Sequence, residues 1–219
     1  MTNTRRKRGT NMRQTVRVGE DDRNFDAIRE AVIDATRPEN LRITVRGKHN
    51  RKDGHIVPIE RYGLNFYVTG SFPNATVYKG EYTQATVYKG KYTQEELDAA
   101  MKNTERAAII GSMFDIVKGG GTPVDDWEYD DDPMLALTTT EQFNGAGVIF
   151  CDRVLQKIYE KMGDYYILPS SIHEVLIVPA TCGLDRDELK EMVCTVNRDQ
   201  VAPEDQLSDE VYFYDGTFH

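Results

Sequence analysis

The stretch Tyr165-Tyr166-Ile167-Leu168-Pro169-Ser170-Ser171-Ile172-His173-Glu174-Val175-Leu176-Ile177-Val178 decides the fold that we predict. Residues 165–168 and 172–178 are rich in aromatic, aliphatic and β-branched side chains, which is typical of strands. Pro169 fixes φ, and the two serines that follow it can hydrogen-bond the backbone of a turn. The stretch therefore predicts two strands joined by a turn, with residues 175–178 in the core.

The elements on either side of this stretch extend the pattern. We expect strands over residues 134–138, 146–150 and 211–214. One helix is expected from Asp152 to Gly163, and another begins at the cap-like pair Asp185 and Glu188. The order β-β-α-β-β-α-β predicts an α+β fold, in which a largely antiparallel sheet carries its helices on one face.

The N-terminal half predicts a small α+β unit over residues 23–92. A helix is expected from Asn24 until Pro38 ends it, followed by strands at 41–45, 55–60 and 64–69. The unit ends in two decamers, 75–84 and 85–94, which differ only by Glu81 against Lys91. Two copies are too few for a solenoid, so we interpret them as a duplicated surface segment, in which each copy forms half of a hairpin.

Residues 93–133 connect this unit to the predicted domain at 134–219. Thr93 and Glu96 form a capping box that opens a helical segment, 93–120, with a second short helix at 112–118. Glycines 119–121 lead into an acidic stretch, and this composition predicts a linker over residues 121–133. The spacing of a calcium loop is absent. Trp127, the only tryptophan, either docks back on the fold or anchors a partner.

The formal net charge of −9 is distributed unevenly along the chain. Residues 1–17 carry +6 and no acid, which leaves −15 on residues 18–219. Such an acidic body repels phosphates and argues against a general nucleic-acid binder. Residues 1–22 predict a disordered basic arm, although Met12 is an alternative start. The arm alone could contact nucleic acid, through Arg5, Arg6, Lys7, Arg8 and Arg13.

Cysteine and histidine usage restricts the class of protein further. The three cysteines form no CxxC pair, which argues against a disulfide framework and favours a reducing compartment. The four histidines lie at no metal-ligand spacing with a cysteine, so we expect no metal and no cofactor. The sequence contains no apolar run long enough to cross a membrane and no secretory signal at its start. We therefore expect a cytoplasmic protein.

Residues 170–174 offer the most site-like chemistry in the chain. A hydrolase would use Ser171 as nucleophile, His173 as base and Glu174 as orienting carboxylate. Adjacent residues of a strand point to opposite faces, so His173 and Glu174 cannot pair locally, whereas Ser171 and His173 share a face. The elbow G-x-S-x-G and the zinc motif H-E-x-x-H are both absent. A structural turn is the interpretation that we prefer, ahead of a binding surface and of catalysis.

Three groups of residues indicate a family. They are Glu95-Glu96-Leu97 with Ala100, Asn103 and Thr104; Asn144-Gly145-Ala146; and Tyr166–Val175 followed by Asn197, Gln200–Glu204, Leu207-Ser208-Asp209 and Tyr212. On these residues the chain from about Tyr92 to Asp215 resembles a bacterial family classed only as a domain of unknown function. The resemblance implies a cytoplasmic protein of the kind found among mobile-element or accessory genes, with no activity, cofactor or catalytic residue assigned.

The leading functional hypothesis is a non-enzymatic interaction or accessory module that binds another protein. Its expected binding residues are Ser170, Ser171, His173, Glu174 and Trp127. One alternative is a nucleic-acid-associated protein that works through the basic arm, and another is a hydrolase that uses Ser171 and His173. The sequence does not indicate an oligomeric state.

Overall fold

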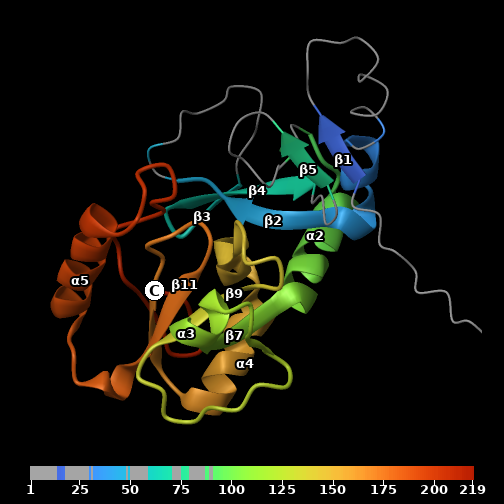
Figure 1. The fold of residues 1–219 in the computed structure, drawn as a ribbon. Coiled ribbons are helices and arrows are strands. Elements are labelled where there is room, and N and C mark those ends of the chain that lie inside the picture. Colours follow the sequence, from blue (N-terminus) through green and yellow to red (C-terminus); the bar gives the residue numbers. More distant parts are fainter. Residues whose placement is uncertain are drawn as a thin grey trace, which may run out of the picture.

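The computed structural model describes residues 14–17, 30, 32–47, 49, 59–70, 75–78, 87–88 and 91–219 of the chain. Its largest element is a six-stranded sheet in the order β12-β10-β11-β9-β7-β8, in which all neighbouring strands run antiparallel (Figure 1). The strands are β7 (Ala108–Ser112), β8 (Thr122–Pro123), β9 (Leu135–Thr139), β10 (Tyr165–Leu168), β11 (Val175–Pro179) and β12 (Tyr212–Tyr214). The predicted α+β class with an antiparallel sheet is confirmed.

A smaller sheet is formed by the N-terminal part of the chain. Strand β4 (Leu64–Gly70) pairs antiparallel with β2 (Leu41–Val45), β3 (Ile59–Arg61) and β6 (Val87–Tyr88). β3 and β4 are joined by Tyr62 and Gly63, both at positive φ, which is the geometry of a tight hairpin turn. The helix predicted from Asn24 is described only at residue 30 and over 32–35, which are helical.

The two decamers contribute to different sheets. In the first copy, β5 (Ala75–Tyr78) pairs in parallel with β1 (Gln14–Arg17), whereas in the second copy β6 pairs with β4. Within the described residues, therefore, neither strand pairs with its own repeat. Most of the remaining decamer residues lie outside the described part of the chain, as does the predicted strand at 55–58.

The main helices are α2 (Gln94–Ala107), α3 (Met113–Val117), α4 (Asp152–Met162) and α5 (Arg186–Asp199). α2 and α5 begin where short-range signals predict and α4 ends where they predict, but β7 interrupts the helical segment predicted over 93–120. Both capping boxes are present, because Thr93 accepts from the backbone of Glu96 and Asp185 from that of Glu188, and each Glu side chain returns a bond. Gly163, at φ 79°, ends α4. Short 3-10 helices are η2 (Pro38–Asn40), η3 (Gly145–Phe150) and η4 (Ala180–Cys182).

Both sheets share one hydrophobic core. Ile43 of β2 and Phe66 of β4 are buried in the same cluster as Ile110 and Ile177 of the large sheet. The rings of Phe66 and Phe150 lie 4.3 Å apart, which joins the small sheet to η3. The N-terminal unit and the family-like domain therefore bury their apolar surface against each other.

Helices pack on both faces of the large sheet, whereas the sequence predicted helices on one face. α4 and η3 bury their apolar side chains on the face that carries Ile167 and Ile177. α5 packs on the opposite face, where Leu189 contacts the cluster of Leu168 and Val178. The strand alternation of β10 and β11 explains the two clusters, since apolar residues occupy both faces of these strands.

Two predicted strands need correction. Residues 146–150 form part of η3 instead of a strand, because a short buried apolar run does not distinguish the two by its period. β11 begins at Val175 instead of Ile172, because residues 171 and 172 pair with the segment around Gln206.

The sequence did not predict strand β7, since Ala108-Ile109-Ile110 follows α2 without a turn signal.

The predicted linker at 121–133 is packed against the domain. Val124 is buried and Trp127 is 5% exposed in the main core. Lys157 pairs with Asp125, and Lys161 pairs with Glu128 and donates to the backbone carbonyl of Trp127. Two of the acids that suggested a solvated linker, Asp125 and Glu128, therefore pair with α4.

Candidate functional site

The predicted site residues lie in a loop between β10 and β11, which we call the His173 loop (residues 169–174). This loop is paired with a second segment, 205–208, along its backbone. The carbonyl oxygens of Pro169 and Ser170 accept from Ser208 and Leu207, at 3.0 and 2.9 Å, and the N–H of Ile172 donates to Asp205 at 2.9 Å. Because backbone groups of the two segments hydrogen-bond each other, the loop is fixed against the domain.

The His173 ring is fixed by three neighbours. Its Nδ1 accepts the backbone N–H of Asn144 at 3.1 Å, which places the proton of the neutral ring on Nε2. Nε2 lies 3.5 Å from Oδ1 of Asp205, and the ring centroid lies 5.1 Å from that of Phe143. The carbonyl oxygen of His173 accepts from Gly145 N–H at 3.0 Å as well.

Ser171 and His173 meet through the backbone and not through a catalytic bond. The Ser171 hydroxyl accepts the backbone N–H of His173 at 2.9 Å, and Ser171 is only 4% exposed. The imidazole nitrogen that could act as a base already accepts from Asn144. The expected pair on one face of a strand is therefore wrong, because residues 172–174 are not in a strand. This geometry does not favour Ser171 as a nucleophile.

Glu174 is half-buried beside these residues. Burial raises the pKa of its carboxyl above the usual value, and the Ser171 hydroxyl and His173 oppose that rise only in part. Asp205 adds a further small rise through its like charge. The carboxyl does not orient the imidazole, since the ring nitrogens face Asn144 and Asp205.

Side chains from a third segment complete the arrangement. The Asn197 amide donates to the Ser208 carbonyl at 2.9 Å and to Oδ1 of Asp209 at 2.7 Å. The Gln206 amide donates to the carbonyls of Asn197 and Val201, at 2.7 and 3.0 Å. Residues that lie far apart in the sequence, at 144–145, 169–174 and 197–209, therefore meet in one hydrogen-bonded network.

Most of the residues on which the sequence resembles a family lie in this network, and the chain does match a family over this region. Residues 83–216, more than half of the chain, match a family of unknown function, DUF5688. The chain belongs to the DUF5688 family. No curated protein and no solved structure matches the chain.

The motif predicted on α2 also has a structural role. Thr104 accepts the backbone N–H of Ile43 at 2.8 Å and donates to the Ala100 carbonyl at 2.8 Å. The Asn103 amide donates to the carbonyls of Pro38 and Leu41, at 2.8 and 3.1 Å. Both side chains bind backbone that lies before the DUF5688 match begins, so the motif attaches the N-terminal unit to the domain.

The other predicted binding residues are placed as follows. Trp127 docks back on the fold and is buried, so its side chain is not presented to a partner. Arg5, Arg6, Lys7, Arg8 and Arg13 lie outside the described residues. Within the part of the chain that the structure describes, no group of three His, Cys, Asp or Glu side chains could hold a metal ion. None of the described helices is long and apolar enough to cross a membrane.

The structure presents a second candidate that the sequence did not indicate. α3 exposes large apolar side chains: Phe114 is 65%, Val117 77% and Met113 37% exposed. Only Ile116 of this helix is buried, against Ile109 and Ala136 of the large sheet. A five-residue helix can bury one side at most, so an apolar sequence around its whole circumference leaves apolar surface in water.

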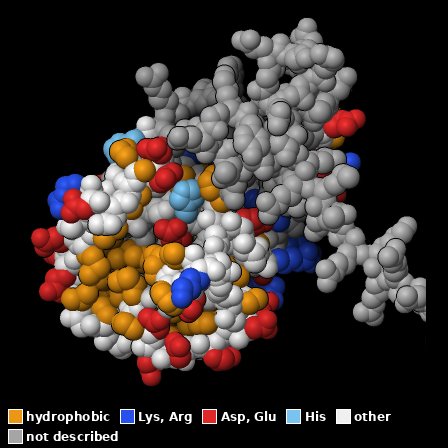
Figure 2. All heavy atoms as spheres, in the orientation of Figure 1, with side chains coloured by type: hydrophobic (Ala, Val, Ile, Leu, Met, Phe, Trp, Pro, Cys, Tyr) orange, Lys and Arg blue, Asp and Glu red, His pale blue; other side chains and the backbone are white. Residues whose placement is uncertain are grey.

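This apolar surface continues from α3 across the sheet toward α5. Leu176 of β11 is half-buried and packs with Ile109 near α3 as well as with Leu168 near α5. Met134, also half-buried, packs in the second of these clusters. Figure 2 shows a broad patch of hydrophobic side chains between the positions of α5 and α3. We call this surface the outer face: Met113, Phe114, Val117, Met134 and Leu176.

α5 borders the outer face with one of its sides. On its other side, Arg186 donates to the Val211 carbonyl at 2.7 Å and Lys190 pairs with Glu210 at 2.8 Å, which directs that side to β12. The buried side of α5 carries Leu189 and Val193, which pack on Leu168 and Val178 of the sheet. A further side of the helix lies away from these contacts. It carries apolar side chains one turn apart, the half-buried Met192 and Val196.

The apolar composition of α3 is visible in the sequence, but it does not show that the helix is exposed. Residues 113–117, Met-Phe-Asp-Ile-Val, hold four apolar residues out of five and precede three glycines. Such a run predicts a buried helix as readily as an exposed one. Exposure follows from the position of α3 at the end of β7, which depends on the strand that the sequence did not predict.

Proposed function

We propose that this DUF5688 protein is a non-enzymatic interaction module that binds another protein through the outer face. The observation that carries the proposal is the exposure of Phe114 and Val117 on α3. A contiguous exposed apolar surface of this kind marks a site of protein association in soluble proteins. Aromatic side chains such as Phe114 dominate the energy of such contacts.

The His173 loop supports this proposal indirectly. Nδ1 of His173 accepts from Asn144, and backbone groups of the loop are bonded to residues 205–208. A catalytic role would need a serine hydroxyl that is free to transfer its proton to a base. The residue types that suggested chemistry thus stabilise the domain that carries the outer face.

The test is a selection of binding peptides against the full chain. A displayed library of peptides is enriched on the wild-type protein, and the affinities of the enriched peptides are measured by fluorescence anisotropy. We expect the variant Phe114→Ser with Val117→Ser to weaken binding by at least about tenfold, because it removes two exposed apolar anchors.

The matched control is Ile33→Ser. Ile33 is 52% exposed but belongs to the N-terminal helix and not to the outer face. Its replacement should leave the affinities unchanged. If the enriched peptides bind the Phe114→Ser, Val117→Ser variant as tightly as the wild type, the outer face is not the binding surface and the proposal is wrong.

Nucleic-acid binding through the basic arm is a separate prediction. It rests on the +6 of residues 1–17. Such binding would weaken steeply with added salt and would be lost when residues 1–17 are deleted. Binding that persists without these residues would exclude the arm.

A further inference from the structure

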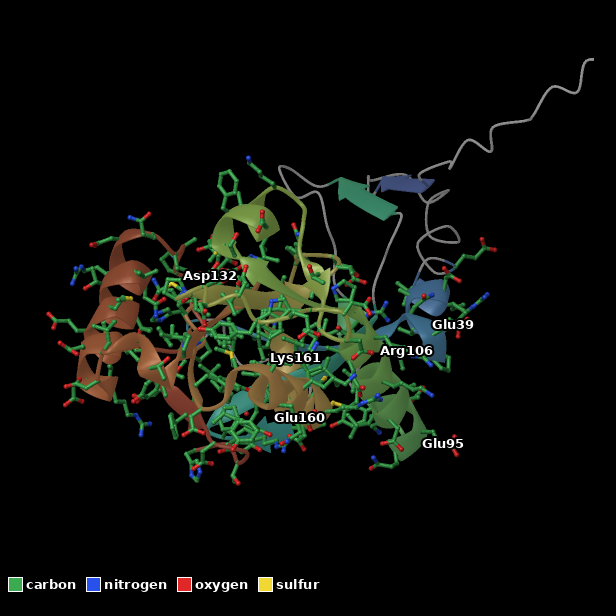
Figure 3. The ribbon with its side chains drawn as sticks, turned by 90° about the horizontal axis from the view of Figure 1, so that it is seen from below. Glu39, Glu95, Arg106, Asp132, Glu160 and Lys161 are labelled. Carbon is green, nitrogen blue, oxygen red and sulfur yellow. The ribbon has the colours of Figure 1, made fainter. Side chains whose placement is uncertain are left out.

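The charge around the outer face restricts which partner it fits. The elements that border the face carry many carboxylates: Asp115 on α3, Asp130, Asp131 and Asp132 before β9, and Asp187, Glu188 and Glu191 on α5. Asp132 lies between α5 and α3 (Figure 3), and its Oδ1 accepts the N–H of Met134. In Figure 2, acidic side chains surround much of the hydrophobic patch.

The basic side chains on the same elements are engaged. Nζ of Lys118 lies 3.7 Å from the ring centroid of Phe114, and Lys190 pairs with Glu210. Arg186 donates to a backbone carbonyl and Arg198 pairs with the neighbouring Asp199. The carboxylates on these elements outnumber the four cations, so the electrostatic potential around the face is negative. An apolar ligand with positively charged flanks is therefore favoured.

The surface favours a helix over an added strand. The backbone groups of β11 and β9 are already paired inside the sheet, so only side chains are offered there. Phe114 and Val117, three residues apart, form an exposed apolar ridge on α3. A helix with apolar residues at the same spacing packs against such ridges.

We propose, on the basis of the proposed function, that the outer face binds a cationic amphipathic helix of a partner protein. The apolar side of the partner contacts Phe114, Val117 and Leu176, and its Lys or Arg residues face the carboxylates at the border. A second copy of this chain is disfavoured, since each copy carries a net charge of −9 and the same acidic border. An anionic membrane is disfavoured by the same repulsion.

The experiment uses three labelled peptides of about 18 residues, each long enough for five helical turns. The first has Leu on one side and Lys on the other, the second has the same Leu pattern with Glu, and the third is a scrambled Lys peptide. Binding to the full chain is measured by anisotropy at low and at moderate salt. We expect the Leu–Lys helix to bind at least about tenfold more tightly than either other peptide, and more weakly at moderate salt.

The variants separate the two proposals. Binding of the Leu–Lys helix should fall at least about tenfold in Phe114→Ser with Val117→Ser and remain unchanged in Ile33→Ser. If the Leu–Glu helix binds equally well and with the same dependence on Phe114, the partner class is wrong while the interaction module stands. If binding of both helices ignores Phe114 and Val117, the outer face is not the site and both proposals are lost.

Two further outcomes would overturn the partner class alone. A dimer in light scattering that dissociates with Phe114→Ser would assign the outer face to a second copy. Binding to vesicles that contain phosphatidylserine, lost in the same variant, would assign it to a membrane. Monomeric protein that leaves these vesicles unbound supports the cationic helix.

Discussion

The sequence of the His173 loop suggests a site that the structure does not favour, whereas α3 is a candidate site that the sequence did not suggest. The loop contains a serine, a histidine and a glutamate within four residues, yet its serine is 4% exposed and its backbone is paired on both sides. α3 contains no motif that suggests a site, yet Phe114 is 65% exposed. Residue type indicates what a side chain can do, but its hydrogen-bond partners and exposure decide whether it is available.

The largest expected effect concerns Gly145, at the base of the His173 loop. A Cβ at this position would lie 2.2 Å from the Thr138 hydroxyl and 2.8 Å from the His173 carbonyl oxygen. We expect Gly145→Ala to lower the free energy of unfolding by about 3 kcal/mol or more, because backbone would have to move. Urea unfolding followed by Trp127 fluorescence measures it.

The control for this prediction is Gly111→Ala, beside α3. A Cβ there would meet its nearest heavy atom at 3.5 Å, an ordinary van der Waals contact. We expect a change within about 0.5 kcal/mol. Equal losses in the two variants would show that the loop is packed no more tightly than the α3 end of the sheet.

The second prediction concerns Asn197, which holds the segment paired with the loop. Asn197→Ala removes the bonds to Ser208 and Asp209 and leaves a buried carbonyl without its donor. We expect a loss of about 1–3 kcal/mol in the same urea measurement. Cys194→Ala, an exposed position on α5, is the control and should stay near the wild type.

The third prediction concerns the pH dependence of Glu174. Burial raises the pKa of this carboxyl in the folded protein, so the folded state binds more protons than the unfolded state above the ordinary value of 4.5. Stability is therefore lost as the pH rises from that value through the raised pKa. We expect Glu174→Gln to remove this loss. The stability of the variant relative to wild type, from urea unfolding between pH 4 and pH 7, should rise with pH; a constant difference would contradict the assignment.

The smallest effect on folding is expected at α3. Phe114→Ser removes an exposed side chain with few buried contacts, so we expect the free energy of unfolding to change by no more than about 0.5 kcal/mol. Thermal unfolding of the variant beside the wild type measures it. A loss comparable with that of Asn197→Ala would mean that Phe114 stabilises the fold and does not serve a partner.

Elements with their own local signals were predictable from the sequence. Thr93 with Glu96 and Asp185 with Glu188 cap α2 and α5, and Gly163 ends α4. β7 and η3 were not predictable, because their apolar residues carry no period that separates strand from helix. Their conformations are set by tertiary contacts, such as the approach of Gly147 to the Ile43 backbone, where a Cβ would lie 2.2 Å from the carbonyl oxygen.

The candidate site was predictable only in composition. The sequence identified Ser171, His173 and Glu174, but the partners of the His173 ring, Asn144 and Asp205, lie about 30 residues away on either side. Trp127 was placed in a linker because its neighbours are acidic. Two of those acids, Asp125 and Glu128, pair with Lys157 and Lys161 on α4 (Figure 3 labels Lys161), a pairing that no local pattern reveals.

The bonds from Asn103 and Thr104 to β2 have a consequence for how this chain can be divided. The match to DUF5688 begins at residue 83, whereas the backbone that these side chains bind lies at 38–43. A fragment that begins at residue 83 would keep Asn103 and Thr104 but lose the backbone groups that they bind. It would also lose Ile43 and Phe66 from the hydrophobic core. The segment of this chain that matches the family is thus smaller than the segment whose side chains share the core.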